Sequence, residues 1–228
     1  MKELILKDLE LCRGPLIVCL GCFFGPYLFW CVYMACTYGF SGNDAREIWS
    51  LGILAASTTS VTLAIVGVAI LTGFVVAGER RDRSSEFLAY LPASRGRILL
   101  SKGLVCFGWI AAYLLAHPLI IDVFVPWLSL GEQQLTGDRG TGVMITCSLA
   151  ILGGSWFGTC ALKSPTLAFG LGILTVPFSY FFVGGLSVYV DWFDDQETAL
   201  MFCSWLQMLI GVAGLILGSL IYMKRVEP

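Results

Sequence analysis

The sequence predicts an all-α, polytopic membrane protein with six transmembrane helices, and three observations lead to that prediction. Only 13% of the 228 residues are charged and 57% are hydrophobic, whereas a soluble domain is about 25% charged. Six uncharged runs approach or exceed the roughly 20 residues that a helix needs to cross a bilayer. These runs are 14–43, 48–78, 103–121, 140–162, 164–190 and 198–223. The basic residues, finally, gather on one side of the resulting topology.

The runs define the elements of one transmembrane domain over residues 1–228. We expect the spans at about 14–38, 50–78, 98–121, 140–162, 165–188 and 199–223. The second run is longer than the hydrocarbon core requires, so its helix should tilt or project beyond the membrane. Glycine pairs with GxxxG spacing allow two helix backbones to approach closely, and they predict where helices meet. The pairs are Gly21/Gly25, Gly154/Gly158 and Gly214/Gly218.

The basic residues predict the orientation. With six spans, twelve of the fourteen lysines and arginines share the side of both termini, and only Arg46 and Arg139 lie on the other. Cytoplasmic loops carry the excess of Lys and Arg. We therefore expect a multi-pass protein of the cell membrane, in a bacterium the inner membrane, with both termini cytoplasmic. The acidic loop 191–197 on the opposite side agrees with this orientation, and either solvation or cation binding would explain its charge.

Residues 1–13 predict an amphipathic helix that lies along the membrane interface before the first span. Positions at helical spacing form one side of it, and charged residues surround them. Those positions are Leu4, Ile5, Asp8, Leu9 and Cys12. A frayed tail is the alternative interpretation.

The spans hold few residues of the kinds that catalysis or metal binding requires. The nine cysteines lie mostly inside apolar runs, where a free thiol behaves as a small hydrophobe, and His117 is the only histidine. We therefore expect no catalytic residue, no bound cofactor and no metal site, and the net charge of -2 gives no indication of a nucleic-acid partner. Four polar residues are candidates for a translocation path, with interhelical hydrogen bonding as the alternative. They are Ser57, Thr58, Thr62 and His117.

The charged segment 78–102 is the strongest functional signal, because it places six basic residues between two uncharged runs. Residues 83–91 predict a short amphipathic helix with Phe87 and Leu91 on one side, and Glu79 can pair with Arg83 at i, i+4. Pro92 should end this helix, since proline disfavours helical geometry in the residue before it, and Ser94 is placed to cap the next helix. The segment is either a docking surface for a soluble partner or a solvated loop that anchors the orientation.

The pattern E-R-x(5)-E-F-L-x-x-L-P-x-S-R-x-x-I-L-L-x-K in this segment resembles the cytoplasmic loop of ABC-2 type transporter permeases. The matching positions cover about a tenth of the chain, and the six-span topology with an interfacial N-terminal helix agrees with the family over the rest. The matching positions are Glu79, Ser85, Glu86, Phe87, Leu88, Leu91, Pro92, Ser94, Arg95, Ile98, Leu99 and Lys102. The sequence departs from the family pattern at Arg80, Arg81 and Arg83, where a milder polar stretch is usual.

The resemblance implies that residues 79–91 are a coupling helix seated in a cleft of a separate ATPase subunit. The residues of that interface would be Glu79, Arg83, Glu86, Phe87, Leu88, Leu91, Pro92 and Arg95. The chain has no G-x(4)-G-K-[ST] phosphate loop, so ATP and Mg would be bound by the partner. Two such ATPase subunits would serve a dimer formed with a second copy or a related permease.

The resemblance further implies export of a substrate that these residues do not identify, and a re-entrant segment near 183–192. Within the transporter class, a permease of the heme-exporter type is an alternative. Outside it, the alternatives are a non-transporting assembly or regulatory subunit of an ABC ATPase, and an intramembrane enzyme. The spans lack the paired Ser/His, paired Asp or Glu/His set that an intramembrane protease needs.

Overall fold

A computed structural model describes residues 2–38, 43–81, 94–128, 138–162, 164–187 and 196–224. Within these ranges the chain forms seven helices and no strand. The helices are α1 (Lys2–Leu11), α2 (Arg13–Tyr38), α3 (Asn43–Arg81), α5 (Arg95–Leu128), α6 (Asp138–Leu162), α7 (Pro165–Ser187) and α8 (Gln196–Lys224). All except α1 are long and apolar enough to cross a membrane. The predicted fold class, an all-α polytopic membrane protein, is therefore confirmed.

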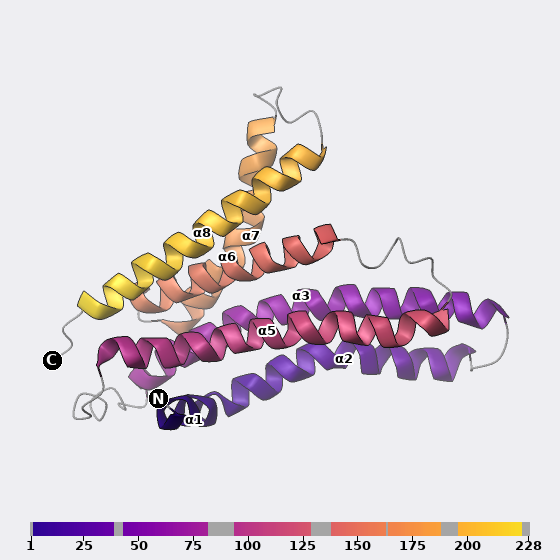
Figure 1. The fold of residues 1–228 in the computed structure, drawn as a ribbon, viewed down its shortest axis with the longest axis horizontal. Helices are drawn as coiled ribbons and strands as arrows, with labels where there is room; N and C mark the ends of the chain where they lie inside the picture. The colour runs from indigo at the N-terminus through magenta and orange to yellow at the C-terminus, as the bar shows by residue number, and fades with distance from the viewer. Residues whose placement is uncertain are drawn as a thin grey trace.

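The helices form two groups that meet along α3 (Figure 1). In the first group, α2 and α5 pack on α3, and the short helix α1 lies against α5. In the second group, α7 and α8 pack on α6. Helix α3 also packs on α6 and α7, so it joins the groups. With 39 residues it is about 58 Å long, which exceeds the roughly 30 Å hydrocarbon core.

One end of the molecule brings together the start of α1, the end of α3, the start of α5 and the end of α8 (Figure 1). We call it the basic end. The described basic side chains at this end are Lys7, Arg13, Arg95, Arg97, Lys102 and Lys224. The segment between α3 and α5, residues 82–93, starts and finishes here, and we call it the connector.

The core of the first group is closed by side chains that donate hydrogen bonds to the backbone of a neighbouring helix. Trp109 Nε1 of α5 donates to the Ala64 carbonyl of α3 at 3.4 Å, and Cys19 Sγ of α2 donates to the Gly67 carbonyl at 3.4 Å. The Ser60 hydroxyl of α3 donates to the Phe23 carbonyl of α2. Lipid cannot replace such bonds, so they hold α2 and α5 to α3 at fixed positions.

The second group packs backbone against backbone. A Cβ at Gly211 of α8 would lie 2.6 Å from the Leu149 carbonyl oxygen of α6, and a Cβ at Gly214 would collide with the Gly153 carbonyl. A Cβ at Gly158 would lie 2.8 Å from Ala168 Cα of α7. Two predicted GxxxG pairs, Gly154/Gly158 and Gly214/Gly218, thus lie where helices meet.

Within the described part of this chain, no helix packs against the first pair. A Cβ at Gly21 or Gly25 of α2 would meet no atom within 4 Å in the described part of the chain. These glycines line an open groove between α2 and α3 that also includes Pro26, Thr59 and Leu63. The spacing of two glycines is therefore not sufficient to place a neighbour against them.

Helix α7 differs from the expected re-entrant geometry. Residues 183–187 continue α7 without interruption, so the first half of the proposed re-entrant segment is ordinary helix. Its remainder, 188–192, lies outside the described residues. Ser164 caps α7, because its Oγ accepts a hydrogen bond from the Leu167 N–H at 3.4 Å. Ser94 directly precedes α5, and its backbone carbonyl accepts hydrogen bonds from the Arg97 and Ile98 N–H groups.

Candidate functional site at the basic end

The connector leaves α3 after Arg81 and enters α5 at Arg95. The structure places two of the predicted coupling residues: Glu79 in the last turn of α3 and Arg95 at the first position of α5. The others lie outside the described residues. They are Arg83, Glu86, Phe87, Leu88, Leu91 and Pro92. What the structure describes in detail is therefore how the two ends of the connector are held.

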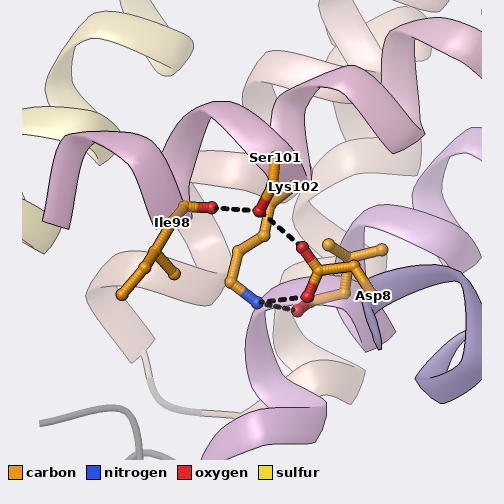
Figure 2. Close-up of polar contacts among 5 residues, drawn as sticks. Asp8, Ile98, Ser101 and Lys102 are labelled. Carbon is orange, nitrogen blue, oxygen red and sulfur yellow. Dashed lines mark hydrogen bonds and ion pairs between the residues drawn. The ribbon is translucent and has the colours of Figure 1, made fainter. Parts of the chain in front are cut away.

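A buried charged cluster lies at this point, and we call its three residues Asp8, Ser101 and Lys102 the anchor (Figure 2). Lys102 Nζ donates a hydrogen bond to the Val75 carbonyl of α3 at 2.7 Å and lies 3.9 Å from Asp8 Oδ1. Ser101 Oγ lies 2.6 Å from Asp8 Oδ2 and 2.8 Å from the Ile98 carbonyl oxygen. Its single hydrogen is donated to one of these two acceptors at a time.

The anchor is sealed from solvent. The side chains of Lys102 and Asp8 are 0% and 5% exposed, and Ser101 is 0% exposed. An ion removed from water loses several kcal/mol of solvation unless a partner compensates it. Each charge here has one: Asp8 faces the ammonium group and the Ser101 hydroxyl, and Lys102 also has the Val75 carbonyl. Removal of either charge alone would leave the other buried and uncompensated.

The anchor joins three helices. Asp8 comes from α1, Ser101 and Lys102 from α5, and the Val75 carbonyl from α3. Lys102 lies two turns after the start of α5, and Val75 lies six residues before the end of α3. The anchor thus holds both helices that flank the connector, and it adds the N-terminal helix to them.

Helix α1 is positioned by its polar residue more than by its leucines. Asp8 and Cys12 are buried, whereas Leu6, Leu9 and Leu11 are at least 38% exposed. The Cys12 N–H donates to the Asp8 carbonyl and the Leu16 N–H to the Cys12 carbonyl, so helical hydrogen bonding continues on both sides of the bend into α2. The helix predicted as an interfacial element is therefore also a packed part of the first group.

Arg95 connects the start of α5 with the second group. Its Nη1 donates to the Met223 carbonyl near the end of α8 at 3.3 Å. The carbonyls in the last turn of a helix have no partner within the helix, and a cation is favoured at that terminus. The contact is on the surface, so its contribution is small compared with that of the anchor.

The four candidates for a translocation path do not share one surface. Ser57 and His117 are buried in the first group, and His117 Nδ1 lies 3.2 Å from the Tyr27 hydroxyl of α2. Thr58 and Thr62 are exposed, and each donates to the carbonyl four residues earlier in α3 at 3.0 and 2.8 Å. Ser57 and His117 therefore fit the alternative, contacts between helices, more closely than Thr58 and Thr62 do.

A second polar cluster joins α6, α7 and α8 in the half of the second group that is farther from the basic end. Gln207 of α8 is 1% exposed. Its Oε1 lies 3.0 Å from Thr146 Oγ1 of α6, and its Nε2 donates to Ser179 Oγ of α7 at 3.0 Å. One amide therefore joins all three helices of the group. The signal that could have shown it is a lone glutamine within the last uncharged run.

No group of three or more metal-ligating side chains occurs among the described residues. Comparison of the chain with protein-family models, with curated proteins and with solved structures finds no match in any of the three. The resemblance to ABC-2 type permeases therefore stays a prediction that depends on the pattern of residues 79–102 and on the six-helix topology.

Proposed function

We propose that the chain is the transmembrane permease subunit of an ATP-binding cassette exporter of the ABC-2 type. ATP is hydrolysed on a separate subunit, which binds the connector and drives the movement of a substrate across the membrane. Both termini and the connector face the cytoplasm in this proposal. The permease acts as a dimer with a second copy or a related chain, together with two ATPase subunits.

One observation supports this proposal above the others: the matched pattern, residues 79–102, runs from the last turn of α3 to the second turn of α5, and the anchor holds those two helices together. A force applied to the connector would reach a buried, directional contact and not a frayed loop. Helix α3 packs on α2 and α5 in its own group and on α6 and α7 in the second group. A displacement of α3 would therefore move helices in both groups. This is the arrangement that a lever driven from outside the membrane requires.

The length of α3 supports the same interpretation. Its apolar span is Leu51–Val76, and five further helical residues continue to Arg81. At 1.5 Å per residue they add about 7 Å. The connector would therefore begin beyond the hydrocarbon core, where a water-soluble subunit can reach it.

The test is association with an ATPase and coupling to it. The tagged full chain, purified from its native membrane in mild detergent, should retain a protein that carries a phosphate-binding loop and hydrolyses ATP. We expect Phe87→Ala and Glu86→Ala to lose most of that protein, because they remove the aromatic and the acid from the predicted coupling helix. Phe181→Ala is the matched control, since Phe181 of α7 is 81% exposed and lies far from the connector in sequence.

Equal retention of the ATPase by all three variants would contradict the coupling-helix assignment. If the ATPase binds through the connector but its turnover drives no transport in reconstituted vesicles, the alternative holds. The chain would then be an assembly or regulatory subunit of an ABC ATPase.

A further inference from the structure

A lateral groove of about 300 Å³ lies between the two helix groups toward the basic end. One wall is the face of α5 that includes Leu100 and Gly103, and the other wall is the face of α8 that includes Leu215 and Ser219. Trp156 of α6 lies between the walls and is 3% exposed. The lining residues that the structure describes all lie on α5, α6 and α8.

The chemistry of the lining suits hydrocarbon. Ser219 supplies the one side-chain hydroxyl among the lining residues, and it accepts a hydrogen bond from Trp156 Nε1 at 3.3 Å. The remaining lining side chains are leucine, phenylalanine and glycine. Leu100 and Leu104 on the α5 wall are 55% and 47% exposed, so the groove opens sideways toward the lipid. A polar molecule would find few hydrogen-bonding partners there, whereas an acyl chain needs none.

Basic residues flank the mouth of the groove at the basic end. Arg95 directly precedes the α5 wall, and its Nη1 contacts the Met223 carbonyl of α8. Lys224, the next residue, ends α8 and is exposed. One cation thus comes from each wall. Basic pockets between transmembrane helices at the membrane surface are typical sites for anionic headgroups.

We propose that this groove binds an anionic phospholipid from the leaflet at the basic end. One acyl chain lies between α5 and α8 above Trp156, and the phosphate is bound by Arg95 and Lys224. The lipid fills the space between the first and second groups. The acyl-chain part of the site uses neither the connector nor the anchor, whereas its headgroup part shares Arg95 with the predicted ATPase interface.

The chain offers a matched pair of variants for the acyl-chain site. A Cβ at Gly103 would meet no atom of the described residues within 4 Å, so Gly103→Leu can enter the groove without a backbone clash at its Cβ. Gly108 lies on the same helix, and a Cβ there would also meet no atom within 4 Å, but Gly108 does not line the groove. Gly108→Leu is therefore the control, with the same gain in helix propensity.

The measurement is native mass spectrometry of the full chain with added phosphatidylglycerol or phosphatidylcholine. We expect wild type and Gly108→Leu to retain phosphatidylglycerol in preference to phosphatidylcholine, and Gly103→Leu to lose it. Arg95→Gln and Lys224→Gln should each weaken phosphatidylglycerol retention about fivefold, while Arg13→Gln, an exposed basic residue of α2, should not.

Two results would overturn the proposal. One is equal retention of the two lipids by wild type, which would mean that the charged mouth selects nothing. The other is equal phosphatidylglycerol retention by Gly103→Leu and Gly108→Leu, which would place the lipid elsewhere. The glycine pair decides the matter even if Arg95→Gln weakens the fold through the loss of its contact with α8.

Discussion

Different interactions hold the helices together within each of the two groups. The buried polar contacts of the two groups, the anchor and the Gln207 amide, lie toward opposite ends of the molecule. In the first group, the Asp8–Lys102 ion pair joins α1 to α5 at the basic end, the Lys102–Val75 hydrogen bond adds α3, and single side-chain bonds join the helices above them. In the second group, α6, α7 and α8 approach backbone to backbone at glycines, and the Gln207 amide joins them in the other half. The packing of the first group depends on a buried pair of opposite charges, Asp8 and Lys102. The close packing of the second group depends on glycines, which have no side chain at the contact.

This difference suggests that the second group is the rigid part of the molecule and the first group the adjustable part. Glycine contacts fix the spacing of two helices through the backbone, so the second group should move as a unit. The anchor is held by three side chains whose contacts can be broken and remade, and it lies beside the connector. If a partner drives this protein, we expect the helices of the first group to shift relative to one another. The second group should then move as a rigid body in response.

The largest effect should come from breaking the anchor on one side. Lys102→Met leaves the Asp8 carboxylate buried without its cation, which costs about 3–5 kcal/mol. Thermal unfolding in detergent should show an apparent Tm lower by about 10 °C. Arg97→Met is the control, because Arg97 is exposed on the same helix, and it should leave the Tm unchanged.

Removing both charges of the anchor sharpens this test. A buried ion pair replaced by apolar residues of similar volume is often neutral or stabilising, so Asp8→Leu/Lys102→Met should regain most of the stability lost by Lys102→Met. A double variant as unstable as the single one would show that Lys102 acts through the Val75 carbonyl alone. If the proposed function holds, the stable double variant in complex with the ATPase should still couple ATP hydrolysis less well.

The next effect should come from the glycine contacts. Gly214→Leu forces a side chain against the Gly153 backbone of α6 and should cost about 3 kcal/mol. Gly21→Leu is the same change on α2, where a Cβ would meet no atom of the described residues within 4 Å, and it should cost nothing. The same unfolding measurement compares the two. Equal losses would mean that α6 and α8 are not packed as the structure describes.

A smaller effect is expected at Gln207. Gln207→Met keeps the shape but removes the amide that contacts Thr146 and Ser179, and polar contacts between helices in membranes contribute about 0.6 kcal/mol on average. We expect a loss of about 1 kcal/mol, since two partners are left without it. Ser204→Ala, which removes a hydroxyl bonded within α8, should cost less, and the reverse order would contradict the network.

The smallest effect should be at the exposed hydroxyls of α3. Thr58→Val and Thr62→Val remove bonds to carbonyls of their own helix, which other residues do without. Their effect on stability should stay within about 0.5 kcal/mol. A transport assay then separates the two interpretations: a marked change in rate without a change in Tm would support a translocation path.

The sequence predicted the elements of the fold because bilayer length and the scarcity of charge are properties of composition. It could not predict which glycine pair would be occupied, since Gly21/Gly25 and Gly214/Gly218 have the same spacing and differ only in what the rest of the chain brings to them. The anchor shows a similar limit. Asp8 stood among apolar residues at helical spacing and Lys102 stood in the matched pattern, but nothing in the sequence paired two residues so far apart along the chain.

The central claim is that the connector faces the compartment in which a soluble ATPase can bind it. Ser85→Cys in a Cys36→Ser background, where Cys36 is the one exposed thiol among the nine described cysteines, can be labelled in vesicles with a membrane-impermeant maleimide. The account predicts labelling only from the cytoplasmic side, with protection when the ATPase is bound, while Thr198→Cys at the start of α8 labels from the opposite side. Labelling of Ser85→Cys from the extracytoplasmic side, or labelling that the ATPase does not change, would contradict it.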